Sequence, residues 1–119
     1  GCTCLSFGIK AKGVIGAWES FTTSENVDKI RSVVLFSDGY QVLTIFNATT
    51  GKFIHSNGGT WKLDGDIMTE KVEFHTDNSE RVGTEVSFEV KVTNSTLEIV
   101  GSGKKFTKID NGTPGEEKL

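Results

Sequence analysis

One carboxylate falls on a strand face where apolar side chains are expected. Glu70 lies two residues after Met68 and two residues before Val72, and residues two apart in a β-strand share a face. Burying a carboxylate without a partner is costly, so the protein must pair it, protonate it or leave water beside it. Glu70 is therefore the first candidate for a functional residue.

Three interpretations of Glu70 stay open at this point. Its carboxyl group binds the polar end of a ligand, or it forms a structural hydrogen-bond network with groups such as Tyr40 or Thr44. In the third interpretation, a bulge near Ile67 and Met68 turns the Glu70 side chain outward.

The remaining candidates for catalysis are few. A nucleophilic triad needs a base, and only His55 and His75 supply an imidazole. His75 directly follows Phe74, so its side chain is expected on the opposite face of the strand. His55 lies beside a turn, and we therefore expect both histidines to be solvated. Glycoside hydrolysis needs two carboxylates facing the site, and Glu70 alone qualifies. We expect no catalytic residue, no cofactor and no metal centre.

Composition limits the class of protein. The chain has 119 residues with 13 basic and 16 acidic side chains, a net charge of −3 and 35% hydrophobic residues. These values fit one globular domain and exclude a disordered or collagen-like chain. A nucleic-acid binder needs a basic surplus, so no nucleic-acid partner is expected. The longest apolar run, Val33 to Phe36, is far shorter than the roughly 18 residues of a membrane span.

A period of two organises the chain into strands. Along residues 84–92 the apolar residues Val86, Phe88, Val90 and Val92 alternate with polar ones, which predicts a half-buried strand. The pair Asp64-Gly65 predicts a tight hairpin turn in which both central residues have positive φ. Reading between such turns gives strands at roughly 14–22, 29–37, 40–47, 52–56, 58–64, 66–75, 84–93 and 95–109, with a break near 102.

These strands predict an all-β fold. Short connections indicate an antiparallel up-and-down arrangement, and closure into a barrel of about eight strands removes the two exposed sheet edges. We expect the barrel to span residues 13–109, after an N-terminal segment 1–12 and before a flexible tail at 110–119.

The N-terminal segment carries both cysteines. Cys2 and Cys4 are too close for an ordinary structural disulfide, and no third ligand lies nearby to complete a zinc site. The segment is typical of a signal-peptide remnant or a linker. Alternatively, Gly1-Cys2 is a lipoprotein junction with a lipid anchor on Cys2. Both interpretations predict an exported protein that is periplasmic, secreted or attached to the cell envelope.

Two stretches resemble a known family. Gly16-Ala17-Trp18 resembles the Gly-x-Trp signature of lipocalins, the calycin superfamily of small barrels, and the longer match runs through residues 50–53, 56–66 and 69–74. Together they resemble lipocalin-like domains of unknown function in exported proteins of Bacteroides-type bacteria. The resemblance implies that Gly16 and Trp18 close the barrel. Lys105 and Lys108 stand where lipocalins place an arginine over that tryptophan.

The resemblance also implies an interior that holds a small hydrophobic or amphipathic molecule. The candidate ligand-binding residues are Tyr40, Thr44, Phe46, Trp61, Met68, Glu70, Phe74 and Phe88. The first hypothesis is non-catalytic binding in the barrel. The second is a filled barrel that serves as a protein-interaction or self-association module, including a homodimer. The third is an enzyme that uses Glu70 as acid or base. A connected void of about 300 Å³ or more favours the first hypothesis.

Overall fold

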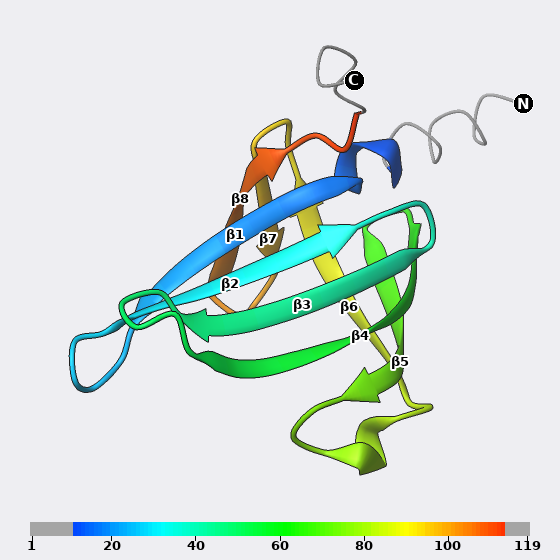
Figure 1. The fold of residues 1–119 in the computed structure, drawn as a ribbon. Coiled ribbons are helices and arrows are strands. Elements are labelled where there is room, and N and C mark those ends of the chain that lie inside the picture. Colours follow the sequence, from blue (N-terminus) through cyan, green and yellow to red (C-terminus); the bar gives the residue numbers. More distant parts are fainter. Residues whose placement is uncertain (1–10, 114–119) are drawn as a thin grey trace, which may run out of the picture.

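The eight strands form one closed antiparallel barrel (Figure 1). The structure, a computed structural model, describes residues 11–113. The predicted all-β barrel is confirmed, with each strand paired to the next along the chain and β1 paired to β8. The strands are β1 Gly16–Thr23, β2 Lys29–Phe36, β3 Tyr40–Asn47, β4 Phe53–Asp64, β5 Ile67–His75, β6 Glu85–Val92, β7 Thr96–Ile99 and β8 Lys104–Asp110. A short 3-10 helix, η1 Ser79–Arg81, lies between β5 and β6.

Some strand and domain boundaries differ from those predicted. The two strands expected at 52–56 and 58–64 are one long strand, β4. The break expected near residue 102 is confirmed, because it separates β7 from β8. Asp110 pairs with Ala17, so the first residue of the predicted tail belongs to the barrel. Cys2, Cys4 and the expected export signal lie mostly outside the described residues. Within residues 11–113, no helix is long and apolar enough to span a bilayer.

Trp18 lies at the seam where β1 meets β8. Its side chain is fully buried, and its indole Nε1 donates a hydrogen bond to the carbonyl of Val14, 2.8 Å away. Lys108, the partner of Trp18 across the seam, holds its ammonium group 5.2 Å from the centroid of the indole ring. That ammonium group also donates to the carbonyl of Gly13 at 3.3 Å. The cation over the tryptophan is therefore Lys108, whereas Lys105 is exposed.

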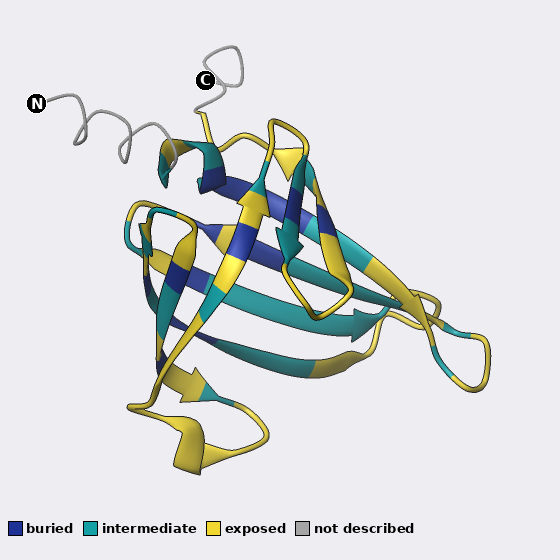
Figure 2. Ribbon diagram, turned by 180° about the vertical axis from the view of Figure 1, so that it is seen from behind, coloured by how far each residue is buried: buried dark blue, intermediate teal, exposed yellow. Residues whose placement is uncertain are grey.

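The core lies inside the barrel, and Figure 2 shows the buried positions along its strands, with the β5–β6 connection exposed. One residue of the core, Val14, was not predicted from the sequence. Residues 11–14 form a helical turn, and Val14 at its end is fully buried in the core cluster. Ala11, at the start of this turn, also packs against the core cluster, so the packed domain begins before the predicted boundary at residue 13.

The side chains of β3 face the opposite way from the sequence prediction. Phe36 pairs with Gln41 and Val34 pairs with Leu43, and directly opposed residues of an antiparallel pair share a face. Gln41 and Leu43 therefore face inward with β2, and Tyr40 faces outward with 59% of its surface exposed. A one-residue change of register turns every side chain of a strand to the opposite face. The inward orientation predicted for Tyr40 and its neighbours on β3 was wrong for this reason.

A bulge in β5 reverses a second set of side chains. Gly59 pairs with Val72 while Gly58 pairs with Phe74, so Glu73 is the extra residue. Phe74 consequently turns outward, whereas Met68, Glu70 and Val72 keep the predicted inward face. The bulge expected near Ile67 and Met68 is not there, because pairing with β4 is regular from Ile67 to Lys71.

Glycines shape both ends of the β4–β5 hairpin. The turn consists of Gly65 and Asp66 between the paired residues Asp64 and Ile67. Only Gly65 has positive φ, at 64°, so the turn places glycine at the first central position rather than having two residues at positive φ. Near the bulge, a Cβ built on Gly59 would overlap the carbonyl oxygen of Lys71. The two strands approach there more closely than a side chain permits.

Replacing Gly59 with alanine should therefore destabilise the barrel. We expect Gly59→Ala to lower the free energy of unfolding by about 2 kcal/mol or more, because backbone must move to accept the methyl group. Urea denaturation measures the loss. The matched control is Gly13→Ala, where a Cβ meets no atom within 4 Å. Equal stability of the two variants would contradict the close approach at Gly59.

Candidate functional site

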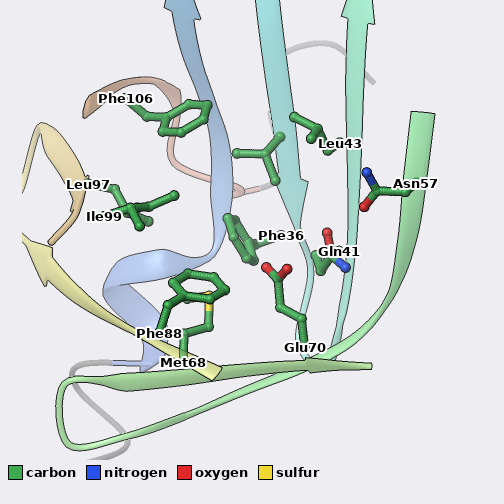
Figure 3. A pocket seen from close by; sticks show the side chains of 11 residues that line it. Phe36, Gln41, Leu43, Asn57, Met68, Glu70, Phe88, Leu97, Ile99 and Phe106 are labelled. Carbon is green, nitrogen blue, oxygen red and sulfur yellow. The ribbon is translucent and has the colours of Figure 1, made fainter. Parts of the chain in front are cut away.

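The barrel interior contains a cavity of about 230 Å³ (Figure 3). Its lining has an apolar side and a polar side. The apolar side chains are Val34, Phe36, Leu43, Met68, Phe88, Leu97, Ile99 and Phe106. The polar side chains are Gln41, Asn57 and Glu70. The polar groups of these three residues lie on one side of the cavity in Figure 3.

Three of the predicted ligand-binding residues line this cavity, namely Met68, Glu70 and Phe88. Trp61 faces inward and is buried, but it packs its ring edge-to-face on Phe36, with 5.1 Å between ring centroids. Its indole Nε1 donates to the carbonyl of Ser37 at 2.9 Å. Trp61 thus belongs to the core beside the cavity rather than to the cavity wall.

The other four predicted residues lie on the outer face, and their expected inward orientation was wrong. Tyr40, Thr44 and Phe46 follow the reversed register of β3. Phe46 packs under Arg31, whose guanidinium carbon lies 5.8 Å from the ring centroid. Phe74 follows the bulge in β5 and is 42% exposed.

Glu70 is the one ionisable residue among the described residues that line the cavity. Its side chain makes no hydrogen bond or ion pair within residues 11–113, so it does not join a network with Tyr40 or Thr44. Burial disfavours the charged form and raises the pKa of the Glu70 carboxyl group from 4.5 to about 7. Near neutral pH the carboxyl group of Glu70 is therefore close to its midpoint of ionisation, and a bound ligand can shift the group toward either the charged or the neutral form.

Gln41 is a second polar group without a partner. Only 5% of its surface is exposed, and its side-chain amide makes no hydrogen bond within the described part of the chain. The amide group points toward the cavity in Figure 3. No side-chain nitrogen or oxygen of the described residues is both fully buried and without a hydrogen-bond partner. The amide of Gln41 therefore borders the open space of the cavity, where a ligand or water can bind it. The sequence interpretation missed Gln41 because it assigned β3 the opposite register.

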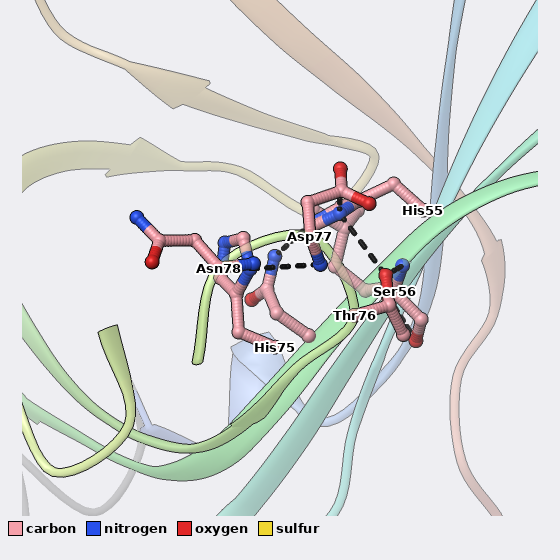
Figure 4. Close-up of polar contacts among 8 residues, drawn as sticks. His55, Ser56, His75, Thr76, Asp77 and Asn78 are labelled. Carbon is pink, nitrogen blue, oxygen red and sulfur yellow. Dashed lines mark hydrogen bonds and ion pairs between the residues drawn. The ribbon is translucent and has the colours of Figure 1, made fainter. Parts of the chain in front are cut away.

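Asn57 lines the cavity and contacts His55, which belongs to a chain of polar contacts with Asp77 (Figure 4). Asp77 accepts from Nδ1 of His55 at 2.8 Å, so the ring carries its hydrogen on that nitrogen. The other ring nitrogen, Nε2, then has a free lone pair and accepts from Nδ2 of Asn57 at 2.7 Å. This arrangement leaves Oδ1 of Asn57 available, and Figure 3 shows this oxygen on the side nearer Gln41 and Glu70.

Both histidines occupy this polar end of the barrel. Their rings meet edge-to-face with 4.6 Å between centroids. His55 has a side chain only 12% exposed, so its expected solvation was wrong. His75 pairs with Asn57 beyond the bulge, and its Nδ1 accepts from the backbone N–H of Asn78 at 2.9 Å. The contact between His55 and Asp77 was not visible in the sequence, because the two residues lie 22 positions apart.

Among residues 11–113, no group of three or more His, Cys, Asp or Glu side chains is arranged to hold a metal ion. One nitrogen of each histidine ring already accepts or donates a hydrogen bond to the protein. The histidine cluster fixes the orientation of Asn57.

The raised pKa of Glu70 predicts a pH-dependent stability. A carboxyl group whose pKa is higher in the folded state stabilises the fold fully below pH 4.5 and loses that contribution as pH rises to about 7. We expect Glu70→Gln to be more stable than the parent near pH 8, by up to about 3 kcal/mol. Near pH 4.5 the two proteins should have similar stability.

Urea denaturation across this pH range tests the prediction, with the exposed Glu89→Gln on β6 as the control. We expect the control to differ from the parent by less than about 0.5 kcal/mol at every pH. A parent and a Glu70→Gln variant with parallel pH profiles would show that Glu70 is not desolvated.

Comparisons with known proteins give no family for this chain. No family model, no curated protein and no solved structure matches it. Function is therefore inferred from the cavity and from the side chains that line it.

Proposed function

We propose that the protein binds one small amphipathic molecule in the barrel cavity and does not transform it. The observation that carries the proposal is the pairing of an apolar wall with three polar side chains, Gln41, Asn57 and Glu70, on one side of an interior cavity. A cavity that is apolar except for a few convergent polar groups is the usual form of a small-molecule site.

The volume of the cavity limits the size of the ligand. Drug-sized ligands occupy pockets of about 300 Å³ or more, and the 230 Å³ available here is below that value. An apolar cavity of about 150 Å³ already admits benzene. The proposed ligand is therefore a molecule with one ring or a short chain and one polar group.

The chemistry of the lining supports binding rather than catalysis. Glu70 is the one titratable side chain among the described residues that line the cavity. General acid–base catalysis on a bound molecule normally needs a second group to exchange or position the proton. His55 and His75 are held in hydrogen bonds beyond Asn57.

Membership of the lipocalin-like family is part of the same proposal. The closed barrel and the position of Lys108 over Trp18 support it, because the resemblance implies a cation over that tryptophan. Export, with or without a lipid on Cys2, stays a prediction from the N-terminal segment.

A cavity-filling substitution tests the proposed function. The probe is 2-phenylethanol, which has one ring and one hydroxyl group, and its binding is followed by NMR chemical shifts of the backbone amides. We expect shifts at residues around the cavity, and we expect Ile99→Phe to weaken binding at least about tenfold because the larger ring occupies cavity space.

The control for this experiment is the neighbouring substitution Val100→Phe. Val100 is 38% exposed and does not line the cavity, so its replacement should leave the affinity unchanged. Equal affinities for the parent and Ile99→Phe would place the probe elsewhere and would remove the proposal. Native mass spectrometry of protein from its own source then identifies the natural ligand by mass.

Self-association is the second candidate function, because an apolar row crosses the outer face of the barrel. Leu35 pairs with Val42, Val42 pairs with Gly58, and Gly58 pairs with Phe74. Leu35 is 48% exposed and Phe74 is 42% exposed. Exposed apolar patches of this kind mark interaction surfaces.

Sedimentation equilibrium tests this second candidate. If the row forms a homodimer, the parent protein should sediment as a dimer, and Leu35→Glu should shift it toward the monomer, because a charge cannot be buried in the interface without a partner. Val100→Glu, on another part of the surface, serves as the control. A parent that stays monomeric at high concentration excludes the homodimer.

A further inference from the structure

The polar side of the cavity offers hydrogen-bond acceptors in excess of donors. Nδ2 of Asn57 is already committed to His55, so Asn57 presents only its oxygen to the cavity. The ionised carboxyl group of Glu70 is an acceptor with two oxygens. Gln41, which has no partner within residues 11–113, is free to present its Oε1 as well. A ligand that satisfies these groups must carry several donors.

The charge of the lining favours a cation. No lysine or arginine is among the described residues that line the cavity, so an anionic ligand would lie beside Glu70 without a counter-ion. A cation would supply the partner that the Glu70 carboxylate lacks. Like charges in an apolar site repel strongly, and opposite charges attract strongly.

We infer that the ligand is a small hydrophobic primary amine. Its ammonium group donates to Glu70, to Oδ1 of Asn57 and to Oε1 of Gln41, and its ring or chain packs against apolar side chains such as Phe88, Leu97 and Phe106. An ammonium group has three donors, which matches the three acceptor residues. This inference rests on the proposed function and names the ligand class for the same cavity.

Binding of an amine must be coupled to ionisation of Glu70. The residues directly opposite Glu70 are Trp61 on β4 and Val86 on β6, and neither of them ionises. His55 and His75 are titratable groups at the polar end of the cavity, where both adjoin Asn57. Because an ammonium group binds the carboxylate and not the neutral acid, the Glu70 proton must leave before the amine is fully bound.

The test compares three probes that differ in their polar group. They are 2-phenylethylamine, 2-phenylethanol and phenylacetate, titrated into the full chain by NMR at about pH 6 and about pH 8. With a pKa of about 7 for Glu70, the carboxylate fraction rises about tenfold over this range. We expect the affinity for the amine to rise by about the same factor, and we expect phenylacetate to bind more weakly than the amine at both pH values.

Glu70→Gln separates this effect from titration of the two histidines, which the variant retains. The variant should lose most of the preference for the amine over the alcohol, and most of the pH dependence. Glu89→Gln, which removes an exposed carboxylate from β6, should behave like the parent.

The outcomes distinguish the two proposals. Equal binding of the amine and the alcohol, or an amine affinity that Glu70→Gln leaves unchanged, overturns the amine inference while the ligand-binding proposal stands. Tighter binding of phenylacetate at low pH also overturns the inference, because it indicates a carboxylic acid that pairs with protonated Glu70. Failure of all three probes to bind the cavity removes both proposals.

Discussion

Backbone pairing between β1 and β8 is the constraint on which the interior depends. An open sheet of these strands would expose the inner face to water, and Glu70 would then be an ordinary solvated carboxylate. The buried side chain of Trp18 lies at this pairing. Its indole Nε1 donates a hydrogen bond to the carbonyl of Val14, and the ammonium group of Lys108 lies over its ring. Closure therefore does more than remove sheet edges. It creates the low-dielectric interior in which one carboxyl group and one amide acquire unusual properties.

The polar end of the cavity is costly for the folded state. Ionisation of the desolvated carboxyl group of Glu70 opposes folding, and Gln41 places an amide without a protein partner among apolar side chains. A leucine or methionine at either position would satisfy the core better. Local conflicts of this kind in an otherwise consistent fold are concentrated at functional sites. The conflict at Glu70 and Gln41 supports the proposal that this cavity is a binding site.

The barrel architecture could be predicted from the sequence. Of the candidate site, Met68, Glu70 and Phe88 were predicted, whereas Gln41 and Asn57 were not. Turn residues and alternation located the strands, and counting by twos from Met68 correctly placed Glu70 inside. The apolar residues of β3 occur on both of its faces, so alternation did not decide its orientation. Reading Asp38-Gly39 as a two-residue turn would have paired Phe36 with Gln41 and revealed the inward amide. Phe74 and the Asp77–His55–Asn57 contacts depend on a bulge and on long-range pairing, which periodicity does not encode.

Asp77, which fixes the orientation of the cavity amide through His55, does not belong to the barrel wall. It lies in the connection between β5 and β6, and its side chain is 61% exposed. Loops of this kind accept substitutions and insertions that strands do not. If the cavity binds a ligand as proposed, sequence drift in this connection can turn the amide of Asn57 and change which molecules fit, while every residue that lines the cavity stays the same.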